Sequence, residues 1–318
     1  MTALAIDPTL ERAVAENPED QGAWLVLEDW LMAQSDPLGH LAELQRLGDR
    51  RRLDEERHHL APVLLGPQHA RLERTLATSL WRGGFVRRAH LFAQPYEVPL
   101  LLSSFLASPA ARFLSQLHVA EAASFAVLST IARAPLLRDL RLRVADPINR
   151  SAEPAVADLD VLAPLAQLES LHLDNAEALA GGHPRVQVLN LSTRRPVVLA
   201  ALVAKLPALE SLDVACLELA HDATRIAAWP ALWHLGIQVD TCGPDPLAPI
   251  VRSGLLAQLD RLRISDCEPS TVPPPRGMWP KRRVPIELDE GAKRSLRGGV
   301  LAQIERVYLA PPLVLHPG

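Results

Sequence analysis

Residues 137–142 read Leu137-Arg138-Asp139-Leu140-Arg141-Leu142, and this L-x-x-L-x-L arrangement decides how the chain folds. The arrangement recurs eight times in 318 residues, with exchanges among aliphatic side chains. From 114 to 137, from 186 to 209 and from 209 to 232 the interval is 23 residues. A single structural unit is therefore repeated along the chain. The copies begin at Leu114, Leu137, Leu168, Val186, Leu209, Leu232, Leu259 and Ile304.

A period of this length with this pattern is typical of leucine-rich repeats, whose units span ~20–29 residues. Such a unit cannot bury its apolar face alone, so neighbouring units must stack into one continuous core. We therefore predict an α/β leucine-rich-repeat solenoid over residues 81–318, with parallel strands on its concave side and short helices on its convex side. Residues 85–91 are expected to form a strand that caps the open end of the first repeat.

Two intervals are longer than the period. From 137 to 168 the interval is 31 residues, and from 259 to 304 it is 45. Val284-x-Ile286-x-Leu288 is expected to form a degenerate strand within the longer interval. Residues 268–285 form a proline-rich insertion, which predicts an extended loop because proline disfavours helix and sheet interiors.

Residues 1–80 predict a small helical domain. Asp7-Pro8 fits a helix cap followed by proline in the first turn. A second helix is expected to start at Asp20. A third, longer helical region is expected over residues 38–57, and a fourth over residues 67–80.

This first part of the chain resembles the repeat-companion domain, an N-terminal unit that accompanies bacterial repeat proteins. The resemblance rests on Glu16-Asn17-Pro18-Glu19-Asp20, Leu25-Val26-Leu27-Glu28-Asp29-Trp30-Leu31, Ser35-Asp36-Pro37, Leu41-Ala42-Glu43-Leu44-Gln45 and Trp81-Arg82-Gly83-Gly84-Phe85-Val86. The family usually has Tyr-Ala-Asp-Trp-Leu at residues 27–31, and Arg-Gly-Phe where this chain has one glycine more, at residues 82–85. The resemblance implies leucine-rich repeats downstream and a bacterial source such as myxobacteria or planctomycetes. It implies no catalytic residue, because the family has no assigned chemistry.

The composition predicts no general attraction to nucleic acid or to anionic membranes, because the net charge is −4. Hydrophobic residues make up 48% and aromatic residues 4%, which suits a core of stacked aliphatic side chains. The chain shows neither a secretory signal nor an apolar run of ~18 residues, so we expect a cytoplasmic protein with no membrane partner. Cys216, Cys242 and Cys267 form no C-x-x-C pair and are expected to be reduced thiols.

Catalytic signatures are not found in the sequence. It has no G-x-S-x-G elbow, phosphate-binding loop, G-x-G-x-x-G or H-E-x-x-H. His58, His59 and His69 belong to a charged helical stretch, which favours a solvated helix face over a metal site. We therefore predict a protein that is not an enzyme and that uses neither a metal nor a cofactor.

The residues between the repeat leucines are the candidate binding residues. Alternate side chains of a strand point to opposite faces, so the third, fifth and seventh positions of each copy should face the concave surface. Trp279, in the proline-rich insertion, is a further candidate, although it also fits a side chain that folds back to fill a gap. The selected strand residues are His118, Arg141, Arg143, His172, Asp174, Asn190, Asp213, His234, Arg261, Arg263, Arg306 and Tyr308.

Three functions fit this pattern. The favoured one is a non-catalytic module that binds a protein or peptide on the concave face, since solenoids use this surface for extended binding. The second is binding of nucleic acid or another anionic ligand through the terminal arginines, which the net charge disfavours. The third is an accessory subunit that presents a peptide substrate to a partner enzyme. A polar strand face also fits a surface that is merely solvated.

Overall fold

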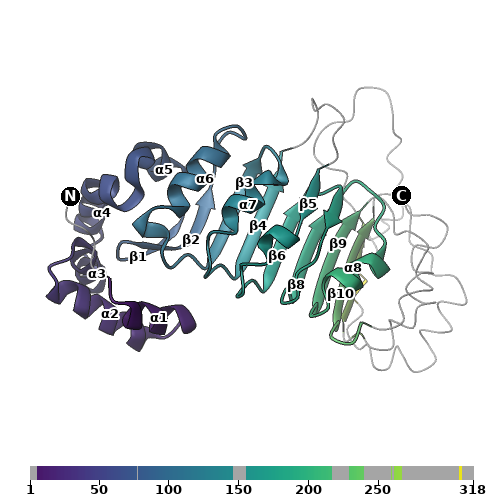
Figure 1. Ribbon diagram of the computed structural model, residues 1–318, viewed down its shortest axis with the longest axis horizontal. Helices are drawn as coiled ribbons and strands as arrows, with labels where there is room; N and C mark the ends of the chain where they lie inside the picture. Colours follow the sequence, from purple (N-terminus) through teal and green to yellow (C-terminus); the bar gives the residue numbers. More distant parts are fainter. Residues whose placement is uncertain are drawn as a thin grey trace, which may run out of the picture. The chain divides into compact units, whose positions relative to one another are not determined.

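A computed structural model of the chain describes residues 6–76, 78–145, 155–216, 229–239, 259, 261–266 and 308–309 (Figure 1). These residues form a mixed α/β structure whose strands are mostly parallel. The chain divides into two compact units, Met1–Ala145 with Val161–Leu168, and Asp146–Asp160 with Glu169–Gly318. The insertion and degenerate strand predicted within 268–288 lie outside the described residues, as do Cys242, Cys267, Trp279 and Arg306.

The first unit begins with five α-helices. The first four each start directly after an aspartate whose carboxylate accepts a backbone N–H of the first turn: Asp7, Asp20, Asp36 and Asp49. Each such cap contributes about 1 kcal/mol, because the first N–H groups of a helix have no partner within the helix. The five helices are α1 (Pro8–Glu16), α2 (Gln21–Ala33), α3 (Pro37–Leu47), α4 (Arg50–Leu65) and α5 (His69–Thr75).

Two helix boundaries differ from the prediction. The long third helix expected over 38–57 is two helices, because Gly48 takes a left-handed φ of 72° that ends α3. Asp49 then caps α4. The fourth helix was expected to reach residue 80, but α5 ends at Thr75 and Leu80 begins a strand.

The strands of the first unit are β1 (Leu80–Arg82), β2 (Phe85–Leu91), β3 (Gln116–Ala122) and β4 (Asp139–Val144), in that spatial order. β1 is antiparallel to β2, and the next two pairs are parallel. Gly83 has a φ of 55° in the turn between β1 and β2, and a Cβ on Gly84 would lie 2.1 Å from Leu38 Cδ2. The turn therefore favours glycine at position 83 for its left-handed φ, while the close packing of Leu38 leaves little room for a side chain at position 84.

Short helices connect these strands. They are η1 (Gly66–Gln68), α6 (Val98–Leu106), η2 (Pro109–Ala111), η3 (Phe125–Val127) and α7 (Leu128–Ile131). α6 packs against β3 and α7. η3 and α7 together form one of the short helical connections expected between the strands.

The main sheet of the second unit is parallel, with strands in chain order. It contains β6 (Ser170–Asp174), β8 (Val188–Ser192), β9 (Ser211–Cys216), β10 (His234–Val239), β11 (Arg261–Asp266) and β12 (Tyr308–Leu309). β5 (Val156–Asp158) and β7 (Ala178–Ala180) form a separate parallel pair, and α8 (Leu199–Lys205) precedes β9. η4 (Asp160–Leu162) lies where the sequence passes from one unit to the other.

Each of the eight L-x-x-L-x-L copies contains a strand, which confirms this part of the prediction. Neighbouring strands place their second leucines in register, as in Leu117 opposite Leu140, and Leu189 opposite Leu212. These leucine side chains are at most 1% exposed, while the next residue along each strand is half-buried or exposed. Each buried leucine contributes about 1.5–3 kcal/mol relative to an exposed one. The leucine ladders therefore stabilise the repeat strands of each unit.

Aromatic and arginine side chains join the helices of the first unit to its strands. Trp24 of α2 is fully buried, with ring centroids 6.2 Å from Phe85 and 5.1 Å from Phe113. The Arg82 guanidinium lies 4.5 Å from the Trp24 ring and donates a 3.0 Å hydrogen bond to the buried Glu28. Trp24 therefore belongs to the joint between helices and strands.

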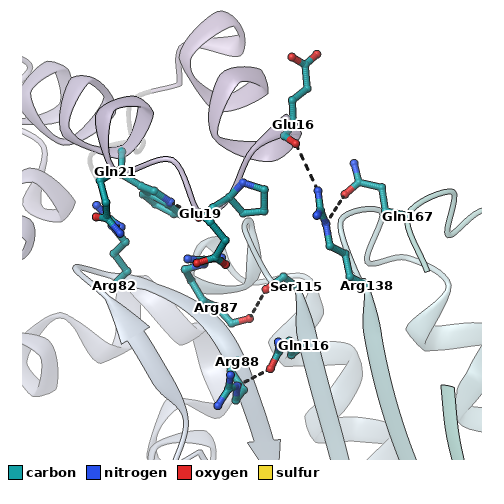
Figure 2. A network of polar contacts seen from close by, with 12 residues as sticks. Glu16, Glu19, Gln21, Arg82, Arg87, Arg88, Ser115, Gln116, Arg138 and Gln167 are labelled. Atoms are coloured by element: carbon teal, nitrogen blue, oxygen red, sulfur yellow. Dashed lines mark hydrogen bonds and ion pairs between the residues drawn. The ribbon is translucent and has the colours of Figure 1, made fainter. Parts of the chain in front are cut away.

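Further arginines extend this joint along the starts of the strands. Figure 2 shows Arg82 beside Gln21, Arg87 beside Glu19, and Arg138 beside Glu16. Arg87 Nη2 donates to Glu19 Oε1 at 2.7 Å, and Arg138 Nη2 donates to the Glu16 carbonyl at 3.4 Å. The helical segment is thus held by polar contacts that reach from β1 to β4.

Candidate partner-binding face

The open face of β2–β4 carries two rows of polar side chains. Arg88, Gln116 and Asp139 are opposite one another in register, and so are His90, His118 and Arg141. They alternate with buried residues along each strand, as the leucine pattern requires. These six residues line a hollow of about 320 Å3, called here the strand hollow.

Contacts within the strand hollow fix its side chains. Arg88 Nε donates to Gln116 Oε1, and Arg141 Nε lies 3.7 Å from Asp139 Oδ1. The His90 and His118 rings meet edge to face, with centroids 5.5 Å apart. The face therefore presents oriented guanidinium and imidazole groups to whatever contacts it.

A β-bulge changes the face beyond these two rows. The pairing of β3 with β4 moves from Val119–Leu142 to Ala122–Val144, so three steps on β3 match two on β4. Both Ala120 and Glu121 consequently lie opposite Arg143. A bulge of this kind redirects side chains that strict alternation would send to opposite faces.

The second hollow lies at this end of the strands and is called here the end cavity. It has a volume of about 690 Å3, within the ~300–1,000 Å3 of typical ligand pockets. Helix α5 supplies Arg71 and Arg74 to its lining, and the segment after β2 supplies Phe92 and Glu97. The bulge residues Ala120 and Glu121 complete the lining with Leu101 and Arg143.

The two hollows have mixed charge. Five arginines line them, against the three carboxylates of Asp139, Glu97 and Glu121. Arg71 is paired with Glu97 at 3.5 Å, whereas Arg74 donates its Nε to the Ala70 carbonyl at 3.2 Å. Arg143 has no hydrogen bond or ion pair within the described parts of the chain. Arg74 and Arg143 therefore retain guanidinium donors for a ligand.

Of the predicted site residues, His118 and Arg141 line the strand hollow and Arg143 lines the end cavity. In the second unit, a row of residues in register contains His172, Asn190, Asp213, Gly236, Arg263 and Tyr308. Asp174 is exposed at the end of β6, and Arg261 is opposite His234.

The polar side chains of the second unit contact one another. Ser170 Oγ and His172 Nε2 are 3.1 Å apart, and Asn190 Nδ2 is 3.4 Å from the same nitrogen. His234 Nε2 lies 3.4 Å from Asp213 Oδ1. That carboxylate occupies the space above Gly236, where a Cβ would come within 1.8 Å of Asp213 Oδ1.

The placement of His234 corrects the prediction. It was expected to face a partner, but it is 7% exposed. Gly236 has no side chain, so the Asp213 carboxylate occupies the space next to His234. His234 therefore supports the position of Asp213 and is not presented to a ligand.

Several residues of the first-unit face were not predicted from the sequence. Arg88, His90 and Phe92 were passed over because residues 85–91 were interpreted only as a cap. Their alternation with the buried Ala89 and Leu91 was nevertheless visible in the sequence. No sequence pattern indicated Arg71 and Arg74, because they lie on helix α5 and reach the ends of the strands only in the folded structure. A group of three or more His, Cys, Asp or Glu side chains fit to hold a metal is absent from the described residues.

Comparisons with known proteins add little to this geometry. Neither a protein-family model nor a curated protein matches the chain. Among solved structures, it is similar to a chain of "Crystal structure of TLR13-ssRNA13 complex", with 13% sequence identity and a TM-score of 0.24. The match covers 55% of this chain and 31% of that chain. No helix among the described residues is both long enough and apolar enough to span a bilayer.

Proposed function

We propose that this chain is a non-catalytic leucine-rich-repeat protein that binds a protein or peptide segment on the open face of β2–β4. The supporting observation is that the strand hollow and the end cavity lie on the same three strands, next to the same bulge. Together they offer charged, aromatic and apolar groups along the strands. An extended peptide segment can place successive side chains against these separate groups.

The charge pattern favours a protein over a nucleic acid. A groove that follows a phosphate backbone gains its affinity from many cations, each neutralising a phosphate. Here three carboxylates stand among five arginines, and two of the arginines lie near carboxylates at 3.5 and 3.7 Å. A polypeptide carrying charges of both signs fits this mixture better than a polyanion.

We further propose that the helices α1–α5 are a repeat-companion domain that closes one end of the repeat sheet. Support comes from β1, which pairs with β2 and leaves no repeat strand at this edge. Trp24 and the arginines of Figure 2 hold the helices against the strands. An end that is closed in this way does not recruit a further strand.

A peptide-display selection tests the binding proposal. Random twelve-residue peptides are selected on the immobilised full chain, and the dissociation constants of selected peptides are measured by fluorescence anisotropy. Replacing Arg141, which is exposed in the strand hollow, with Glu should weaken these peptides about tenfold or more, which corresponds to ~1.4 kcal/mol. Arg133→Glu makes the same charge change at an exposed position two residues after the end of α7 and should leave binding unchanged.

Two results would overturn the proposal. One is a selection that yields no peptide, and the other is equal binding of selected peptides to the wild type and to Arg141→Glu. Single-stranded RNA is the comparison probe. If RNA binds more tightly than any peptide, with a steep loss of affinity as salt is raised, the polyanion alternative replaces the protein partner.

A further inference from the structure

We infer that the end cavity is a subsite for a carboxylate of the bound segment, with an apolar side chain next to it. This inference rests on the proposed function and names the chemistry that the face selects. It concerns Arg74 and Arg143 as the anion-binding groups and Phe92 with Leu101 as the apolar wall.

The electrostatic argument starts from the pairing already present. Arg71 is committed to Glu97 at 3.5 Å, so it does not offer a full charge to a ligand. Arg74 has no carboxylate partner among the described residues, and Arg143 makes no hydrogen bond or ion pair there. Each keeps a guanidinium edge whose two N–H groups match the two oxygens of a carboxylate.

The same lining limits the charge of the ligand. Glu97 and Glu121 both border the cavity, so the three arginines exceed the carboxylates by a single charge. A singly charged carboxylate balances this difference, whereas a doubly charged phosphate would face uncompensated repulsion from Glu121. The bulge in β3 is what places Glu121 here, so the selection against a dianion is built into the backbone.

The apolar part of the subsite is held in place by its neighbours. Phe92 is 52% exposed, and its ring centroid lies 6.0 Å from His118 and 6.4 Å from His90, both edge to face. A ring fixed in this manner offers a rigid surface at little entropic cost on binding. The volume of about 690 Å3 leaves room for a carboxylate and an adjacent apolar side chain together.

The test uses three N-acetylated peptides as probes: acetyl-Gly-Phe-Glu-Gly-amide, its Gln counterpart, and acetyl-Gly-Phe-Gly with a free carboxyl end. Binding to the full chain is followed by NMR through the arginine Nε–Hε signals. We expect the Glu peptide to bind at least about tenfold more tightly than the Gln peptide. Preference for the free carboxyl end over the Glu side chain would assign the subsite to a chain terminus, which also supports the inference.

Variants connect that preference with the two arginines. Arg74 and Arg143 are both exposed. Replacing either one with Gln should abolish the preference for the Glu peptide over the Gln peptide. Arg133→Gln is the matched control and should retain it. Equal binding of Glu and Gln peptides to the wild type, or tighter binding of inorganic phosphate than of the Glu peptide, would overturn the carboxylate assignment.

Failure of this inference is distinguishable from failure of the proposed function. If display-selected peptides lose affinity for Arg141→Glu but are indifferent to Arg74→Gln and Arg143→Gln, the face binds peptides and the end cavity is no carboxylate subsite. If selection yields no peptide and the Glu peptide does not bind, both proposals fall.

Discussion

Gly236 and Asp213 form a coupled pair within the second unit. A Cβ on Gly236 would lie 1.8 Å from Asp213 Oδ1, a separation that real structures do not permit. We predict that Gly236→Ala lowers the free energy of unfolding by about 1 kcal/mol, because the partly exposed Asp213 carboxylate can move aside but then loses its contact with His234. The measurement is urea unfolding followed by circular dichroism.

A double-mutant cycle checks the cause. The double variant Gly236→Ala/Asp213→Ala lacks the obstructing carboxylate. Its loss of unfolding free energy should therefore be clearly smaller than the sum of the losses of the two single variants. If the losses are additive, the strain arises elsewhere around Gly236 and the assigned clash is wrong.

Glu11 gives a residue-scale prediction with a pH dependence. Burial raises the pKa of this carboxyl above 4.5, and the Arg112 guanidinium at 2.7 Å opposes the shift only in part. Because the folded pKa exceeds the unfolded one, the folded state binds the proton more tightly. The stability that Glu11 contributes is therefore present below the unfolded pKa and is lost as the pH rises through the folded pKa.

Comparison with Glu11→Gln isolates this effect from all other titrating groups. We expect the unfolding free energy of the wild type, relative to the variant, to be lower near neutral pH than below about pH 4.5. A difference that stays constant with pH, or that grows as the pH rises, would contradict the raised pKa.

At the scale of elements, the joint between the helices and the strands depends on a buried ion pair. Arg82 and Glu28 have side chains that are 16% and 7% exposed, and their atoms are 3.0 Å apart. Removing one partner leaves the other buried and unpaired, which costs about 3–5 kcal/mol. We predict a loss of this size for Arg82→Ala in chemical unfolding.

The matched control is Arg51→Ala in α4. Its pair with Glu55 has a similar separation of 2.9 Å, but the two side chains are 88% and 61% exposed. Such exposed pairs contribute roughly 0–1 kcal/mol. Similar losses for the two variants would show that the Arg82 pair does not hold the joint.

The elements were largely predictable from local sequence. Asp7, Asp20 and the repeated leucines each act within a turn or a strand, so a short pattern carries their signal. Gly48 was overlooked because the charged residues after it continue a helical composition, although its left-handed φ ends α3.

The site was only partly predictable, because its groups come from separate elements. His118 and Arg141 follow from strand alternation, but the end cavity requires α5, α6 and the bulge of β3 to meet. His234 was misplaced for a related reason. Whether a strand residue faces solvent depends on side chains of the neighbouring strand, and the Asp213 carboxylate that contacts His234 is opposite Gly236, 21 residues away from His234 in sequence.

For the whole molecule, stability should be distributed locally along the strands. Each strand of the second unit pairs only with its immediate neighbours. Loss of a contact in one strand should therefore lower the local stability of that strand and its two neighbours most. Leu212 in β9 is fully buried, and Leu212→Ala should cost about 2–5 kcal/mol. Hydrogen exchange should accelerate most in β8, β9 and β10, and less in β2 and β3. Uniform acceleration over all strands would indicate one fully cooperative structure instead.

The in-register ladder has a consequence for how binding specificity can change over time. Outside the β3 bulge, Arg141 and Asn190 each alternate with buried aliphatic positions that stay in register with those of the neighbouring strand. A mutation at Arg141 or Asn190 alters one contact without disturbing the packing beneath it. Evolution can therefore change binding specificity through single substitutions on this face, while the buried aliphatic residues stay the same.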